Sequence, residues 1–245
     1  MSRAGGAVAL LGLIALWQAA TSILHVSPLF MPSPLAIAAA LYQLVVHGDL
    51  LSQVGVSVLR ILAGWSLGVV AGLALGLGMG LFSFARSAGF SIVSALFPIP
   101  KIALLPLMIL WFGIGEGSKV ATIALGVFFP TAISAASGVD SVPRNLIRMA
   151  QSFGLPFGDI VRKVVLPGAL PSILAGFRIS SSIALLLVVS AEMIGAEKGI
   201  GAFVLQAGNL MQTDQLLAGV VVLSLIGLVV ARAIGALEAR LIDWR

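Results

Sequence analysis

The chain has 245 residues, of which 60% are hydrophobic and 9% charged, and its mean hydropathy is +1.15. Soluble domains carry roughly 25% charged residues, so this composition excludes an ordinary soluble protein and indicates a membrane protein. The net charge of +5 does not indicate nucleic-acid binding, because the basic residues stand at the ends of apolar runs and form no patch. With no Cys and only two His, the chain offers no basis for a disulfide, a thiol nucleophile or a metal site.

Six apolar runs are long enough to cross a bilayer, because a membrane-spanning helix needs roughly 20 mostly apolar residues. We predict an all-α membrane protein, a single domain over residues 1–245, with spans at about 6–24, 56–82, 88–111, 118–137, 172–195 and 214–236. Arg3 before the first run also allows a cleaved secretory signal there. The Pro-rich stretch 27–34 predicts an extended connection before a short helix at 35–46. Residues 199–213 predict a short helix that dips into the outer face of the membrane, where we also expect the 27–34 connection.

Basic residues in the short connections predict the orientation of the spans, since they gather on the cytoplasmic side. With an inner N-terminus, ten of the fourteen Lys and Arg fall on one side: Arg3, Arg86, Arg144, Arg148, Arg162, Lys163, Arg178, Arg232, Arg240 and Arg245. Lys119 and Lys198 fall on the other side, beside Glu116 and Glu197. We therefore expect both termini and the polar stretch 138–171 to face the cytoplasm.

The second predicted span carries a glycine at every fourth residue. We call this set the glycine stripe; its members are Gly64, Gly68, Gly72, Gly76 and Gly80. A helix with such a stripe allows the backbone of a neighbouring helix to approach closely. Two interpretations stay open, namely helix packing within the chain and an interface with a second subunit.

Lys101 lies among the three prolines of residues 98–106, about 22 Å of helix rise from Arg86, so we expect it deep in the membrane. A cation there is costly unless it faces a polar cavity, a carboxylate or free carbonyls. Lys101 therefore bonds carbonyls that the prolines release, extends its ammonium to the membrane surface, or lines the route of an anionic substrate. Ser181 and Glu192 in the fifth span are further candidates for that route. The alternatives are a bond to its own helix for Ser181 and an interfacial or paired structural role for Glu192.

The stretch 138–171 is polar and basic, and apolar runs flank it on both sides. Its pattern predicts a short helix at 144–153 that ends at Gly154 in a left-handed cap. A second short helix is predicted at 157–165, ending before the Leu-Pro pair at 166–167. Together these helices would form a compact knob in water. A basic loop lying on anionic lipid is the alternative.

This stretch resembles the cytoplasmic coupling loop of ABC importer permeases. Ala150, Gly154, Leu166 and Pro167 fit the family pattern Glu-Ala-Ala-x3-Gly-x9-Ile-x-Leu-Pro. The blocks 98–116, 166–179, 191–201 and 237–245 are similar to permeases of the nitrate, sulfonate and taurine type. The resemblance assigns docking of an ATPase subunit to Arg148, Met149, Ala150, Gln151, Ser152, Gly154, Leu155, Leu166 and Pro167.

Within that segment we expect the small Ala150 to let the partner surface approach, and Met149 and Leu155 to offer apolar contact. One departure concerns charge, because Arg148-Met149 stands where the family has Glu-Ala. A contact that the usual Glu makes would be lost or reversed in sign.

The resemblance implies the transmembrane domain of a type I ABC importer in the bacterial inner membrane, for a small anionic solute. It further implies a homodimer, two cytoplasmic ATPase subunits and a periplasmic or lipid-anchored substrate-binding protein, with membrane lipid around the spans and no nucleic acid. The chain has no Gly-x4-Gly-Lys-Ser/Thr phosphate loop. ATP and Mg are therefore expected on the ATPase, with no cofactor, catalytic residue or metal on this chain.

Two other classes are weighed against this expectation. An ion-coupled secondary transporter needs carboxylates inside the membrane, and only Glu192 is available in the last two spans. An intramembrane enzyme would need a nucleophile with a base, or a metal pair, and the predicted spans contain neither. The sequence therefore favours the permease of an ATP-driven importer, which is no enzyme itself.

Overall fold

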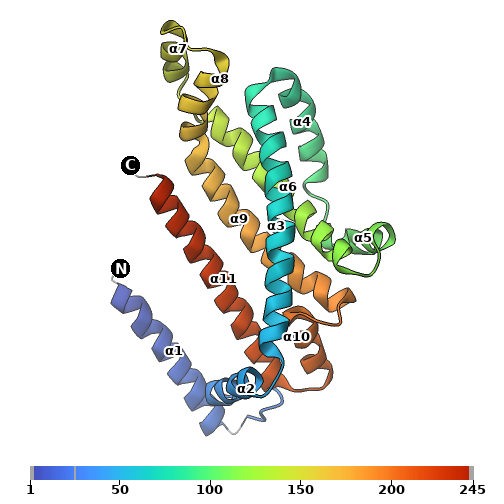
Figure 1. Cartoon of the computed structure of the whole chain (residues 1–245). Helices are drawn as coiled ribbons and strands as arrows, with labels where there is room; N and C mark the ends of the chain where they lie inside the picture. Colours follow the sequence, from blue (N-terminus) through green and yellow to red (C-terminus); the bar gives the residue numbers. More distant parts are fainter. Residues whose placement is uncertain (1–2, 25, 243–245) are drawn as a thin grey trace. The chain divides into compact units, whose positions relative to one another are not determined.

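The computed structural model describes residues 3–24 and 26–242, and the regular structure in these residues is helical (Figure 1). The helices are α1 Arg3–Ile23, α2 Pro34–Val46, α3 Leu50–Leu81, α4 Ser83–Leu96, the 3₁₀ turn η1 Lys101–Leu104, α5 Leu105–Phe112, α6 Glu116–Asp140, α7 Arg144–Ser152, α8 Phe157–Ile160, the π turn η2 Val161–Val165, α9 Leu166–Gly195, α10 Ile200–Asn209 and α11 Thr213–Leu241. Arg245 and the end of the 237–245 motif lie outside the described residues.

The described chain divides into two compact units. Unit 1 consists of the chain up to Ser57 together with Glu192–Ile226. Unit 2 consists of Val58–Ala191 and the chain from Gly227 onward. The prediction of one domain over residues 1–245 stays a prediction.

Four stretches of the described residues are helical, long and apolar enough to span a membrane. They are Leu50–Leu81, Glu116–Asp140, Phe157–Gly195 and Thr213–Leu241, which correspond to the second, fourth, fifth and sixth predicted spans. The first predicted span coincides with α1, whose stretch Val8–Ile23 is a shorter apolar helix. The third predicted span corresponds to a pair of helices, α4 and η1–α5, with a break between them.

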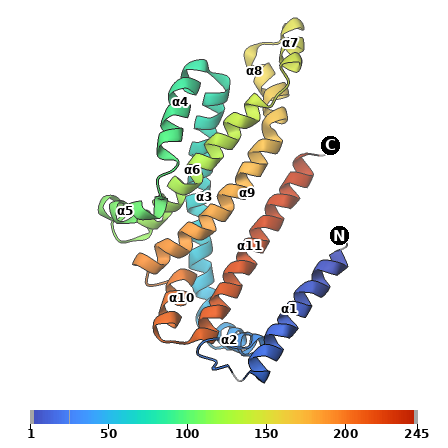
Figure 2. The ribbon, with the colours of Figure 1, turned by 180° about the vertical axis from the view of Figure 1, so that it is seen from behind.

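The predicted span over 88–111 is therefore broken in the structure, at the prolines that were expected to disfavour a straight helix. The two parts are bent by 86°, and both views show α5 turned away from α4 (Figures 1 and 2). Pro98 and Pro100 fall in the break, where proline removes backbone donors and disfavours helix. The ammonium of Lys101 donates to the carbonyls of Leu96, Phe97 and Ile99, with Nζ–O distances of 3.0 Å to Leu96 and 2.8 Å to Ile99.

The glycine stripe of α3 packs against α6 within unit 2. A Cβ atom built on Gly72 would lie 2.6 Å from the carbonyl oxygen of Phe128, and one on Gly64 would lie 2.6 Å from the Ile123 side chain. Contacts this short are not tolerated, so only glycine lets the two backbones come together. The intrachain interpretation of the stripe therefore has a physical basis, since α6 occupies the space beside it.

Unit 1 contains the short helix that was predicted at 35–46. It begins at Pro34, and the Ser33 hydroxyl accepts a hydrogen bond from the Ala36 amide at 3.2 Å, as an N-cap does. Ile37 and Ala40 of α2 pack with Ala218 of α11 in a small apolar cluster. The short helix predicted within 199–213 is α10.

Candidate functional site

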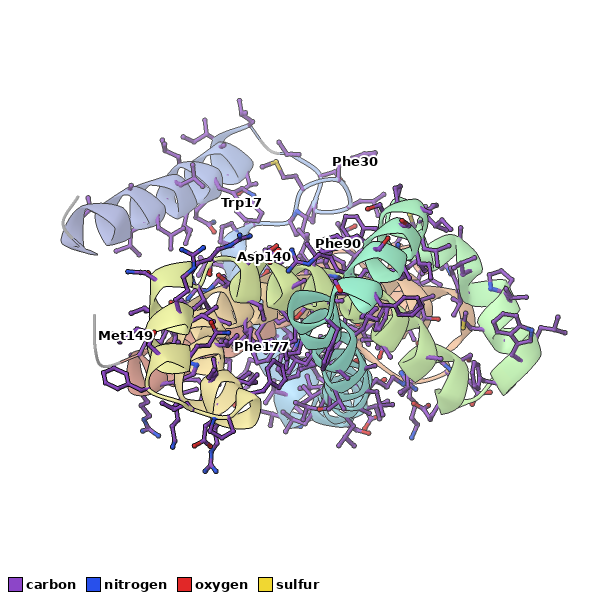
Figure 3. All side chains as sticks on the ribbon, turned by 90° about the horizontal axis from the view of Figure 1, so that it is seen from above. Trp17, Phe30, Phe90, Asp140, Met149 and Phe177 are labelled. Atoms are coloured by element: carbon purple, nitrogen blue, oxygen red, sulfur yellow. The ribbon has the colours of Figure 1, made fainter. Side chains whose placement is uncertain are left out.

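The helix α7 divides sharply into a covered face and an exposed face. Ala150 is buried, with 6% of its surface accessible, and it packs with Val139 and Ile160 in the apolar core of unit 2. On the other face, Met149 is 54% exposed. Figure 3 looks down on this end of unit 2 and labels Met149 on α7. The covered face fixes the helix, and the exposed face is available to a partner.

Gly154 ends α7 in the left-handed conformation, with a φ of +73°. The Leu155 amide donates to the Ala150 carbonyl at 3.2 Å, and the Gly154 amide donates to the Gln151 carbonyl at 2.9 Å. These two bonds are those of the Schellman motif, which satisfies the last carbonyls of a helix. The predicted left-handed cap is confirmed, and it fixes the direction in which the chain leaves α7.

The second helix of this region does not stop before the Leu-Pro pair, so that prediction is wrong. A helical path runs without interruption from Phe157 to Gly195. It passes through the π turn Val161–Val165, where the Leu166 amide donates to the Val161 carbonyl. Pro167 follows directly, and we attribute the widened turn to its ring, which would collide with the carbonyl four residues earlier in a regular helix. We use the name α7–α8 segment for residues 144–165.

The α7–α8 segment is basic and carries exposed charge. It holds four basic residues and one acidic residue, namely Arg144, Arg148, Arg162, Lys163 and Asp159. The Lys163 ammonium lies 2.9 Å from the Asp159 carboxylate. An exposed pair of this kind contributes little to stability. What matters is the excess of positive charge, which favours a partner with carboxylates.

The residues assigned to docking fall into two groups. Five are exposed: Arg148, Met149, Gln151, Ser152 and Gly154. Ala150 is buried, and Leu155, Leu166 and Pro167 are partly buried. Ala150 and Leu155 both pack against the core of their own unit, and direct contact of either with a partner stays a prediction. By packing against the core, Ala150 and Leu155 hold in place the segment that carries the exposed residues.

Two exposed aromatic side chains were missed by the sequence reasoning. Phe153 is 76% exposed and Phe157 is 58% exposed, on either side of the Gly154 turn. The Phe157 ring lies 6.1 Å from the ring of Phe82. The sequence did carry one signal for an exposed aromatic side chain, namely Phe153 directly before the predicted cap glycine. Aromatic side chains of this kind often anchor protein interfaces.

The three residues predicted to line a pathway have partners of their own. A lysine ammonium has three N–H donors, and for Lys101 three carbonyls accept them. Its Nζ also lies 4.6 Å from the centre of the Phe129 ring. The Ser181 hydroxyl donates to the Arg178 carbonyl at 2.9 Å, and Glu192 is 1% exposed. A pathway role for them stays a prediction.

Solved structures of importers share this fold. An inward-facing structure of the MetNI methionine ABC transporter matches with a TM-score of 0.68 and 22% identity, covering 78% of this chain and 95% of that one. An amino acid ABC transporter crystallised with histidines matches with a TM-score of 0.63 and 16% identity, covering 78% and 92%.

Sequence relatives extend over nearly the whole chain. The taurine transport system permease protein TauC of Escherichia coli (strain K12) is 37% identical over 95% of this chain and 86% of its own length. The aliphatic sulfonates transport permease protein SsuC of Bacillus subtilis (strain 168), assigned as putative by its name, is 34% identical over 95% and 84%. Residues 68–243 match the family described as "Binding-protein-dependent transport system inner membrane component". The chain therefore belongs to this family, and it is a multi-pass permease subunit of an ATP-driven ABC importer, whose ATPase is a separate subunit.

Proposed function

We propose that this permease imports taurine or an aliphatic sulfonate. The observation that carries the proposal is the similarity to TauC, at 37% identity over 95% of the chain. The similarity to SsuC, at 34% identity over the same share, supports the sulfonate class as a whole. These solutes have in common a sulfonate group, a permanent anion at neutral pH.

The solute is tested by uptake in a bacterial strain that lacks its own taurine and sulfonate importers. The strain would express this chain with its ATPase and its binding protein, and would be given labelled taurine. Unlabelled ethanesulfonate should compete, whereas nitrate and methionine should not. Uptake that nitrate blocks and ethanesulfonate does not would contradict the proposal, and calorimetry on the binding protein would then identify the solute class.

We also propose that the α7–α8 segment is the surface that receives the ATPase, and that two copies of this chain form the transport pathway. The support is the exposed set Met149, Phe153 and Arg148 on a helix that Gly154 caps and Ala150 anchors. Because Ala150 and Ile160 pack in the same core cluster as Ala169 of α9, a push on α7 is transmitted to a membrane-spanning helix. Closure of the two ATPases would thereby alternate the access of the pathway.

This assignment requires the α7–α8 segment and both termini to lie in the cytoplasm. The distribution of Lys and Arg supports that orientation. The energy source is tested separately, since orthovanadate stops ABC ATPases and an uncoupler removes ion gradients. In inside-out vesicles loaded with labelled solute and its binding protein, ATP added outside should drive release of the solute. This release should fall with vanadate and persist with the uncoupler. Release abolished by the uncoupler alone would instead support an ion-coupled secondary transporter.

A further inference from the structure

The short helix α10 in unit 1 begins without a capping residue of its own. Its N-cap position is Gly199, which has no side chain to accept a hydrogen bond. The first amides of a helix have no partner within the helix, and an unsatisfied amide inside a membrane protein is costly. At α10 these amides are satisfied by side chains from two distant parts of the chain.

Three successive amides each have a side-chain acceptor. The Gly199 amide donates to Oε1 of Gln53 at 2.6 Å, and the Ile200 amide donates to the Ser57 hydroxyl at 2.8 Å. The Gly201 amide donates to Oε2 of Glu192 at 2.8 Å. Gln53 and Ser57 stand four residues apart on one face of α3, which is the spacing that presents both to α10.

Glu192 joins these bonds into one network. The Ser57 hydroxyl donates to its carboxylate, 2.8 Å from Oε1 and 2.9 Å from Oε2, while it accepts from the Ile200 amide. Both side chains are buried, with 1% of Glu192 and 0% of Ser57 accessible. A Cβ atom on Gly199 would overlap the Glu192 carboxyl group, so the carboxylate needs glycine there as well.

The backbone on both sides of α10 can act as a hinge. Gly199 has a φ of +128°, and Met211, just beyond the other end, has a φ of +58°. A methionine in the left-handed region is strained, because its Cβ crowds the following carbonyl. Packing also holds this ten-residue helix, since Ile200 and Ala207 are buried. The network at its N-terminus adds bonds of defined direction to that packing.

We propose that Glu192 is a positioning residue for transport, which, through Ser57, binds α10 to α3 and to the end of α9 so that the three segments move as one body. The expected effect on solute uptake rests on the proposed function, since importing a solute requires the subunit to change its conformation. It gives Glu192 a role that needs no contact with the solute. The network is the same in every state of the cycle.

Amide hydrogen exchange on the assembled importer tests the network. Exchange at 199–201 should be slow both without nucleotide and in the vanadate-trapped state. Ser57→Ala and Glu192→Leu should speed it about tenfold or more, as expected for lost hydrogen bonds to a charged group. Glu192→Gln should lie between them and the unaltered protein, because an amide keeps one acceptor oxygen. Two matched controls should change nothing: Ser190→Ala, which removes only a bond to the Leu186 carbonyl of its own helix, and Glu197→Gln, at an exposed position.

Uptake per folded complex should be lower for Glu192→Gln than for the unaltered protein, and lowest for Glu192→Leu. The ATPase should still copurify with each variant. Equal uptake by Glu192→Leu and the unaltered protein would overturn the proposal, as would fast exchange at 199–201 in one of the two states. If Glu192→Leu does not accumulate, Ser57→Ala decides, because it removes a single oxygen atom from a helix. Failure of the unaltered chain to bind an ATPase would sink the docking proposal, whereas the order of exchange rates among the variants could still be measured on the permease alone.

Discussion

Replacing Gly154 by alanine changes the backbone cap of α7 and nothing else nearby. A Cβ atom at this position would meet no other atom within 4 Å, so the substitution creates no clash. The cost comes from the φ of +73°, which residues with a side chain rarely adopt. Gly154→Ala is therefore a clean test of whether the direction of the chain after α7 matters for coupling.

The magnitude follows from the left-handed conformation. An L-residue there costs roughly 1–2 kcal/mol, which corresponds to about a 5- to 30-fold loss in the population of the capped form. Asparagine tolerates this region better than alanine, and a β-branched residue tolerates it worst. We therefore expect coupling to decline in the order Gly154, Asn, Ala, Val, with Gly154→Val uncoupling transport.

The assay measures copurification of the ATPase and solute uptake for each variant at matched amounts of folded permease. Gly158→Ala is the control, since Gly158 lies in the same segment, also has open space around it, and has no left-handed φ. It should keep full activity. The reasoning is refuted if Gly154→Ala and Gly158→Ala behave alike, and the docking assignment fails if Gly154→Val keeps both ATPase binding and uptake.

Three further predictions concern charge, packing and the bend. Arg148→Glu should weaken ATPase copurification at low salt, because a partner that faces a basic helix carries carboxylates, and an equal or stronger association would contradict that charge pattern. Gly72→Leu should lower the yield of folded protein measured by fluorescence-detected size exclusion, since its side chain would meet the Phe128 carbonyl, whereas Gly78→Leu, with open space, should not. Lys101→Met should depress anion uptake. If Lys101 only stabilises the bend between α4 and α5, the loss of uptake will follow the loss of heat stability. Unchanged uptake together with unchanged stability would refute both roles.

The parts of the fold that depend on neighbouring residues could be predicted from the sequence. Ser33 and Pro34 mark the beginning of α2, and Gly154 marks the end of α7, because caps are formed by residues a few positions apart. The glycine stripe likewise predicts a close helix neighbour. The neighbour itself, α6, could not be identified, since spacing on one helix says nothing about which partner fills the groove.

The features that the sequence missed depend on long-range contacts. Three prolines predict a disturbed helix at 98–106. The size of the bend, however, depends on where α5 packs and on the carbonyls that accept hydrogen bonds from Lys101. The pattern of α7 predicts an apolar face without saying what covers it, so the packing of Ala150 with Val139 and Ile160 could not be predicted. Glu192 has its partner Ser57 135 residues away, and no local pattern indicates that pair.

A single cysteine in place of Met149 tests the central claim most directly, because the chain contains no other cysteine. In intact cells, Met149→Cys should resist a membrane-impermeant thiol reagent. In inside-out membranes it should react when the permease is alone and be shielded when the ATPase is bound. A short thiol-to-amine cross-linker should join it to the ATPase subunit. Labelling from outside the cell, or equal reactivity with and without the ATPase, would contradict the account.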